Sequence, residues 1–345
     1  MQLKKITSRG YGTSLLTGWR IFLCMIFLVS GNALYGQGTE VGSYSFLNVS
    51  ANAKAAALGG VNVSLADDDV DFLTSNPALL GDTLSGFASA SYQFYVGDIG
   101  YAGFAYAHDF NRLGTVGFGV QHLGYGTIKS FDETGQEIGD FNASATALVI
   151  SKHHQVGNFR VGGNIKAAFS TISGFRSNAL MMDLGGVFIH PKNDLTVGLV
   201  IKNAGILLSD YSETSESKLP FDVQLGLTIK PEHMPLRFSV TAYGLRELSD
   251  SNDAVEASSL GKVLRHFNFG GELLLHRNFN LMLGYNYRVH QELKLEQAGG
   301  MAGVSFGFLA RIKTFEFVFS RSTYVVGTAG YGFTLSANVE KMITR

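Results

Sequence analysis

The chain has 345 residues, of which 46% are hydrophobic and only 16% are charged. Glycine supplies 42 of them, about 12% against roughly 7% in average proteins, and the formal net charge is −1. The low charge excludes a disordered acidic or basic chain. The glycine content argues against a helical bundle, because each glycine in a helix interior costs about 1 kcal/mol.

The first 36 residues are predicted to be a secretory signal peptide. Basic residues precede the apolar run 21–29, and small residues at positions 31, 33 and 36 offer cleavage points. The run is too short for a transmembrane helix, which needs about 20 residues. Cleavage near Gly36 leaves 309 residues, removes the single cysteine, Cys24, and takes the formal net charge to −5. This acidic balance argues against a nucleic-acid partner.

From residue 85 to the end of the chain, apolar residues alternate with polar or small ones, which is the pattern of β-strands with two different faces. In 221–230, for example, Leu225 and Leu227 flank Gly226, and Thr228 follows. A soluble sandwich alternates too, but its polar faces carry many Lys, Glu and Asp residues. Here Gly, Ser, Thr and Asn predominate, which suits the inside of a closed barrel whose apolar faces point at lipid.

The sequence therefore predicts an all-β fold, an about 14-stranded antiparallel transmembrane β-barrel in the outer membrane. Short and long connections alternate, with the long ones expected outside the cell at 129–139, 171–177, 203–218, 246–262, 289–298 and 321–325. The even number of strands puts both termini in the periplasm. The strands are expected at 85–95, 99–109, 115–128, 140–151, 159–170, 178–189, 195–202, 219–230, 235–245, 263–275, 279–288, 299–309, 312–320 and 326–339.

Residues 37–84 do not alternate and are predicted to form a short N-terminal hatch inside the lumen of the barrel, which covers 85–340. Ser50 is expected to cap a short helix over 51–58, and Gly59–Gly60 to end it. Fewer than 50 residues bury too little surface to fold as a separate domain without disulfide bonds or bound metal ions. Packing inside the barrel is therefore the better interpretation.

Two sets of motifs resemble a known superfamily. The run Ala55-Ala56-Ala57-Leu58-Gly59-Gly60, then Asp67, Asp68, Asp69 and Asp71, then Asn76-Pro77-Ala78-Leu79-Leu80 resembles the N-terminal hatch of the FadL-type outer-membrane barrels. YSFLN at 44–48, YGT at 125–127, DETG at 132–135 and GDFNAS at 139–144 resemble the PorQ family of the Bacteroidetes type IX secretion system, sister to PorV. The similarity covers residues 38–340.

This resemblance implies a non-enzymatic outer-membrane component of the type IX protein secretion system. Barrels of that family anchor the surface protein PorZ and work with PorU and PorV in cargo attachment. The alternative is a FadL-like transporter of hydrophobic small molecules, although the inward positions are mainly polar. A diffusion porin is a third interpretation, which a hatch disfavours. The candidate partner-binding residues lie in two predicted outer loops: Asp210, Tyr211, Glu213, Glu216, Glu247, Asp250, Asp253 and Glu256.

No catalytic, cofactor or metal site is expected. The run 303–307 matches G-x-S-x-G but lies in a predicted strand, whereas a nucleophile elbow needs a strand-to-helix turn. The aspartates at 67–71 lack the spacing and the closing glutamate of an EF-hand. Ion binding by these aspartates is the less favoured of two hypotheses. The favoured one is that they pair with lumen-facing Arg160, Lys166 or Lys230 and so tether the hatch.

Overall fold

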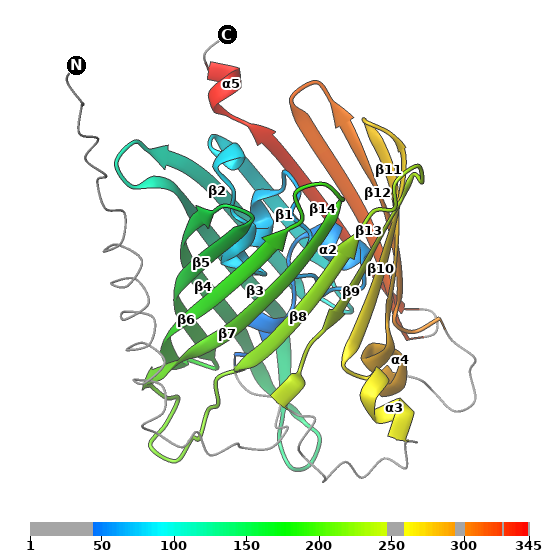
Figure 1. Ribbon diagram of the computed structural model, residues 1–345. Coiled ribbons are helices and arrows are strands. Elements are labelled where there is room, and N and C mark those ends of the chain that lie inside the picture. Colours follow the sequence, from blue (N-terminus) through cyan, green and yellow to red (C-terminus); the bar gives the residue numbers. More distant parts are fainter. Residues whose placement is uncertain (1–43, 247–258, 294–300, 326–327, 344–345) are drawn as a thin grey trace, which may run out of the picture. The chain divides into compact units, whose positions relative to one another are not determined.

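The computed structural model describes residues 44–246, 259–293, 301–325 and 328–343 (Figure 1). The predicted signal peptide and residues 37–43 of the predicted hatch lie outside them. Within the described residues, fourteen strands form one closed antiparallel barrel in which each strand pairs with its neighbours in the sequence and β1 pairs with β14. The predicted fold class is thus confirmed. The strands are β1 (Phe87–Phe94), β2 (Gly100–Phe110), β3 (Gly114–Phe131), β4 (Glu137–Val156), β5 (Phe159–Ile172), β6 (Phe175–Ile189), β7 (Leu195–Ser209), β8 (Asp222–Ile229), β9 (Leu236–Ala242), β10 (Phe267–His276), β11 (Phe279–Asn286), β12 (Val304–Ile312), β13 (Phe315–Val325) and β14 (Thr328–Asn338).

The two faces of the strands have the predicted chemistry. In β5, Ile165 is 62% exposed on the outside, whereas its neighbour Lys166 is 1% exposed on the inside. In β8, Leu225 and Leu227 face outward, and Thr228 is buried within the barrel. The closed ring pairs the backbone polar groups of every strand, which is what a wall surrounded by hydrocarbon requires. The exposed apolar belt therefore suits contact with lipid acyl chains.

Several predicted outer loops are wrong in extent because the strands continue through them. Pairing in the β3–β4 hairpin runs as far as Phe131 and Glu137, so most of the expected loop 129–139 is strand. The β5–β6 hairpin closes tightly, with Ile172 paired to Phe175. The β7 strand likewise extends to Ser209. Polar residues such as Lys129 and Asp140 are typical of loops, but here they lie on strands that extend beyond the apolar belt.

The long connections at this end of the barrel follow β7, β9 and β11, and two of them contain short helices. These are α3 (Ser259–Leu264) and α4 (Tyr287–Leu293), while α5 (Glu340–Ile343) follows β14 at the opposite end (Figure 1). We call the end with the long connections the outer end, and the other the inner end. No helix in the described ranges is long and apolar enough to cross a membrane.

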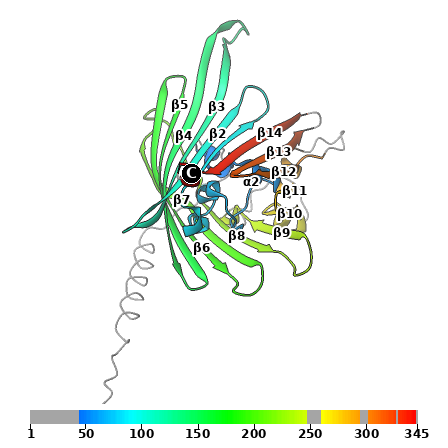
Figure 2. The same cartoon turned by 90° about the horizontal axis from the view of Figure 1, so that it is seen from above.

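Residues 44–84, which we call the hatch, lie inside the ring of strands (Figure 2). They form η1 (Ser45–Asn48), α2 (Ala53–Ala57), η2 (Val70–Thr74), η3 (Pro77–Leu79) and η4 (Asp82–Leu84). The hatch begins near the outer end, where Tyr44 Oη lies 2.7 Å from Ser177 Oγ. It ends near the inner end, where Gly86 N donates to Ala107 O. The hatch therefore passes through the lumen from one end toward the other.

Candidate functional site

The helix α2 is positioned by local caps and then by the barrel wall. Asn52 Oδ1 accepts from Ala55 N at 3.0 Å and is the N-cap. The expectation that Ser50 caps the helix is wrong, because its hydroxyl accepts instead from Asn52 N. Gly59 and Gly60 end the helix as predicted, with φ of 95° and 97°. Gly60 N donates a hydrogen bond to Ala55 O at 2.8 Å.

Side chains of the wall satisfy the free carbonyl groups at the end of α2. Ser305 Oγ donates to Ala57 O at 3.0 Å, and Asn268 Nδ2 donates to Leu58 O at 2.8 Å. Asn286 Nδ2 donates to Gly59 O at 3.1 Å. A helix end buried without such partners is destabilising, so these inward polar residues fix α2 against β10, β11 and β12. Ser305 belongs to the G-x-S-x-G match and lies in β12, as predicted.

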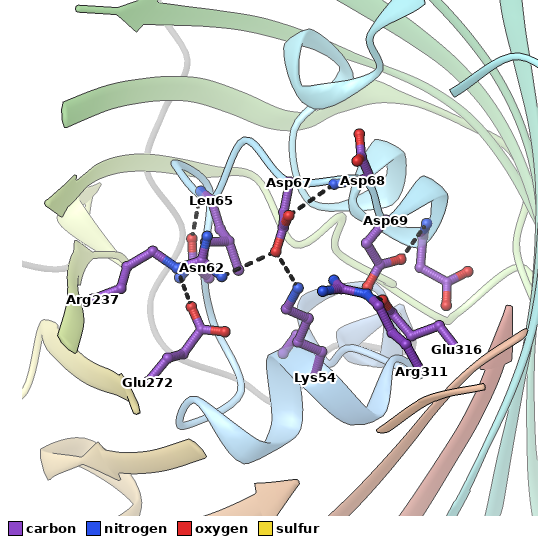
Figure 3. A network of polar contacts seen from close by, with 12 residues as sticks. Lys54, Asn62, Leu65, Asp67, Asp68, Asp69, Arg237, Glu272, Arg311 and Glu316 are labelled. Atoms are coloured by element: carbon purple, nitrogen blue, oxygen red, sulfur yellow. Dashed lines mark hydrogen bonds and ion pairs between the residues drawn. The ribbon is translucent and has the colours of Figure 1, made fainter. Parts of the chain in front are cut away.

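The ionic centre of the hatch is a chain of charged groups around Asp67 (Figure 3). Asp67 Oδ2 accepts from Lys54 Nζ at 2.5 Å and from Arg237 Nη2 at 3.0 Å. Arg237 is on β9, and its Nε donates to Glu272 of β10. Burial raises the pKa of Asp67, but the charges of Lys54 and Arg237 lower it more and hold it well below its usual range. Asp67 is thus a charged bridge between hatch and wall.

The predicted tethers are wrong in their partners, although an aspartate of the cluster does tether the hatch. Lys166 pairs with Asp183 at 2.7 Å, within the wall. Lys230 pairs with Asp194 at 2.9 Å near the inner end. Arg160 donates to the backbone oxygen of Leu79 at 3.5 Å. The alternation places all three inward or at the rim, but it does not show at what height in the lumen each meets the hatch.

The other aspartates of the cluster have different environments. Asp68 is exposed, whereas Asp69 and Asp71 are buried beside each other and share the Nδ2 group of Asn52. Asp71 also accepts from the hydroxyl groups of Ser89 and Ser91 at 2.7 Å. Burial, together with the neighbouring carboxylate of Asp71, raises the pKa of Asp69 to about 7.

The η3 turn is fixed by Asn76 and Pro77, as the motif suggests. Asn76 is 0% exposed, and its Oδ1 accepts from Ala78 N at 3.0 Å. Its Nδ2 donates to Val63 O at 2.9 Å, which ties two segments of the hatch together. Pro77 occupies the first position of the turn, where its missing N–H costs nothing.

Close packing holds the hatch where hydrogen bonds do not. A Cβ atom added at Gly198 would lie 2.1 Å from Val63 O, and one at Gly284 would lie 2.1 Å from Gly59 N. Only glycine allows the two backbones to approach so closely at these positions. At five further positions around the lumen an added Cβ would lie within 3.2 Å of a hatch atom. We name the whole set the glycine collar: Gly162, Gly185, Gly198, Gly226, Gly270, Gly284 and Gly307.

The candidate partner-binding residues are only partly described. Asp210, Tyr211, Glu213 and Glu216 lie in the connection between β7 and β8 at the outer end. There Asp210 accepts from Ser217 Oγ at 2.6 Å, and Tyr211 Oη donates to Ser170 Oγ at 2.6 Å, so part of this loop is held to itself and to the wall. Glu247, Asp250, Asp253 and Glu256 lie outside the described residues. Among the residues that are described, no three His, Cys, Asp or Glu side chains gather as a metal site.

Known structures share the fold of this chain, but no sequence comparison assigns it to a family. No protein-family model matches the chain. No curated protein matches its sequence. The toluene transporter TbuX of Ralstonia pickettii superposes with a TM-score of 0.53 at 13% identity, covering 84% of this chain and 98% of that one. A deltaS2 mutant of the TodX monoaromatic hydrocarbon channel gives 0.51 at 11% identity, with coverage of 87% and 98%. A FadL homologue of Pseudomonas aeruginosa gives 0.46 at 10% identity, with coverage of 84% and 98%.

At such identities the likeness is one of fold. The fold implied by the resemblance to FadL-type barrels is confirmed, and it fits the predicted place in the outer membrane. The PorQ assignment, the partners and the periplasmic position of the termini stay predictions.

Proposed function

We propose that the chain is a FadL-like outer-membrane transporter, in which the hatch gates the passage of hydrophobic small molecules through the barrel. The observation that carries the proposal is the hatch itself, a separate segment that fills the lumen and is held there by reversible contacts. Because the contacts between hatch and wall are hydrogen bonds, ion pairs and packing, the hatch can be displaced without breaking a covalent bond. The shared fold with a toluene transporter and a monoaromatic hydrocarbon channel supports the same kind of activity.

An apolar cluster near the outer end is buried while the hatch is seated, and displacement of the hatch would offer it to a hydrophobic molecule. Phe46 and Leu47 of η1 are each 2% exposed and belong to one buried cluster with Tyr101 of β2 and Met181 of β6. The rings of Phe46 and Tyr101 meet edge to face at 6.4 Å. Below this cluster the hatch fills the lumen with two further apolar clusters and with the ion pairs of Lys54, Asp67 and Arg237. A solute that crosses must therefore displace part of the hatch.

A reversible lock on the hatch tests the proposal. Ser64 Oγ of the hatch lies 2.8 Å from Thr228 Oγ1 of β8, so Ser64→Cys with Thr228→Cys places two thiols in contact. We expect proteoliposomes with the wild-type barrel to take up labelled toluene or a long-chain fatty acid saturably. Uptake should fall in the oxidised double variant and return after reduction. The single variant Ser64→Cys is the matched control.

Two results would contradict transport. One is uptake no faster than in empty liposomes, and the other is equal uptake by the locked and the reduced barrel. Free diffusion of small polar solutes through the wild-type barrel would instead support a porin.

A second candidate is an anchor for a surface protein of a type IX secretion system, with PorZ as the partner and PorU and PorV as associates. Its support is the motif resemblance, together with the length of the outer connections after β7, β9 and β11 and the acidic residues that the sequence places in the first two. Deletion of 209–218 or of 246–262 tests it through the amount of PorZ retained at the cell surface. Unchanged retention in both deletions would count against the anchor.

A further inference from the structure

A crevice between the hatch and the barrel wall is lined by side chains with polar groups that have no hydrogen-bond partner among the described residues. On the hatch side it is lined by Leu47–Ser50, Gly60–Asn62 and Thr74–Ser75. On the wall side it is lined by Gln121 of β3, Lys202 of β7 and Gln224 of β8. It encloses about 310 Å³ of space free of atoms, which includes its open side, and it is narrow.

Lys202 is the cation of this crevice and is only 6% exposed. Among the described residues its ammonium group has no hydrogen-bond acceptor and no ion pair within 4 Å, although Asp222 faces it across the β7–β8 ladder and Asp183 lies near enough to interact with its charge. Both carboxylates have other hydrogen-bond donors. Asp183 accepts from Lys166 Nζ at 2.7 Å and from Asn203 N at 2.8 Å. Asp222 accepts from Gln224 Nε2 at 2.7 Å and from Gly244 N at 2.8 Å. A buried ammonium group without an acceptor is costly, so it needs an anion or water from outside the chain.

Lys202 points into the lumen by the regular alternation of β7, and a bulge turns its neighbour Asn203 inward as well. The register between β6 and β7 shifts between Met182 and Leu184, and Asn203 adopts the left-handed conformation with φ of 57°. As a result the consecutive side chains of Lys202 and Asn203 are both buried inside, against the usual alternation. Bulges commonly re-aim a side chain next to a functional site. Here the bulge inserts one more polar residue into the lumen beside the crevice.

Two further groups in the lining are unpaired. Asn62 is 1% exposed; its Oδ1 accepts from Ser64 N and Leu65 N, while its Nδ2 has no partner among the described residues. Gln224 is 2% exposed, and its Oε1 likewise lacks a partner there. The lining therefore offers an ammonium group and a free amide donor for an anion. The free carbonyl oxygen of Gln224 suits a water molecule that hydrates such an anion.

We propose that this crevice binds a small monovalent anion, with Lys202 Nζ supplying the charge and Asn62 Nδ2 a hydrogen bond. The narrowness of the crevice selects an anion of halide size over a larger carboxylate or phosphate. Bound there, the anion would join residues 60–62 of the hatch to β7 across the lumen. The inference does not depend on whether the barrel transports a solute.

Anomalous diffraction with bromide tests the proposal on crystals of the full mature chain. We expect an anomalous peak within hydrogen-bonding distance of Lys202 Nζ and Asn62 Nδ2. Lys202→Met should abolish the peak, because the apolar side chain keeps the length but removes the charge. Lys230→Met is the matched control, since Lys230 pairs with Asp194 near the inner end, and it should leave the peak unchanged.

A second variant keeps the test decisive if Lys202→Met does not fold. Asn62→Asp preserves the oxygen that accepts from Ser64 N and Leu65 N, but replaces the free donor with a second carboxylate oxygen that repels an anion. It should also abolish the peak. A wild-type crevice without bromide would overturn the proposal, as would a peak that persists in Lys202→Met or Asn62→Asp.

Discussion

Replacing the central aspartate of the hatch should release the hatch without opening the barrel. In Asp67→Asn, Lys54 Nζ loses the carboxylate that lies 2.5 Å away, and Arg237 loses its contact with the hatch. Removing one partner of a buried ion pair costs about 3–5 kcal/mol. The side chain of Lys54 is fully buried but that of Asp67 is 20% exposed, so the lower end, about 3 kcal/mol, applies.

That cost should raise the fraction of molecules with a displaced hatch by about a hundredfold or more, since each 1.36 kcal/mol is a factor of ten. Limited proteolysis measures this fraction, because cleavage follows the population of the open state when closing is fast. We expect rapid cleavage within 44–84 in the variant and slow cleavage in the wild type. The barrel band that shifts on heating should survive, because no bond between strands is removed.

A surface ion pair of the same chemistry provides the control. Asp194→Asn breaks the contact with Lys230. The side chain of Asp194 is 68% exposed and that of Lys230 is 35% exposed. Exposed pairs are worth about 0–1 kcal/mol, so the hatch should stay protected in this variant. If Asp67→Asn and Asp194→Asn were cleaved at the same rate, the ionic bridge would not be what holds the hatch.

Three other changes test separate parts of the site. Asn76→Ala removes the hydrogen bonds to Ala78 N and Val63 O and should destabilise the hatch by about 1–3 kcal/mol, seen as faster proteolysis with an unchanged barrel band. Gly198→Ala should destabilise the seated hatch by about 1–3 kcal/mol through overpacking, whereas Gly186→Ala, where nothing lies within 4 Å of the added Cβ, should be neutral in the same assay. The third change is in pH. Asp69 keeps its proton up to about pH 7 when the hatch is seated, but only up to about pH 4 when the hatch is released. The stability of the seated hatch should therefore fall as the pH rises from about 4 to 7 and then level off. Protection measured at pH 5 should exceed that at pH 8, and Asp69→Asn should reduce this difference, although burial also raises the pKa of Asp71 beside it. Equal protection of the wild type at both pH values would refute the assignment.

The barrel could be predicted because its signal is local. Each inward residue such as Lys166 lies next to an outward one such as Ile165, so the period of two is visible in the sequence without any knowledge of pairing. The ends of the strands were harder to place. In the β3–β4 hairpin the ladder continues past the apolar belt into water, where Lys129 and Asp140 look like loop residues although they pair across the ladder.

The candidate site was predictable in its hatch residues but not in its wall residues. Asp67, Asn76 and the Gly59–Gly60 pair lie in one short motif, so the sequence alone could single them out. Arg237 and Glu272 are 170 and 205 positions away from Asp67, and their meeting depends on the height at which β9 and β10 pass the hatch. Lys202 follows the regular alternation of β7, but the sequence does not show which hatch residues it faces. The bulge turns only its neighbour Asn203 inward against that alternation. The one local hint in the sequence was that residue 203 is an asparagine, which tolerates the left-handed conformation better than most residues.

Besides its hydrogen bonds to the wall, the hatch is held by two kinds of contact that fail at different displacements. Contacts of the glycine collar are short-ranged, so a shift of a fraction of an ångström already loses much of them. The ionic bridge from Lys54 through Asp67 to Arg237 falls off more slowly with distance, because charge interactions vary as the inverse of separation. A small displacement therefore loosens packing while the bridge still connects the hatch to β9.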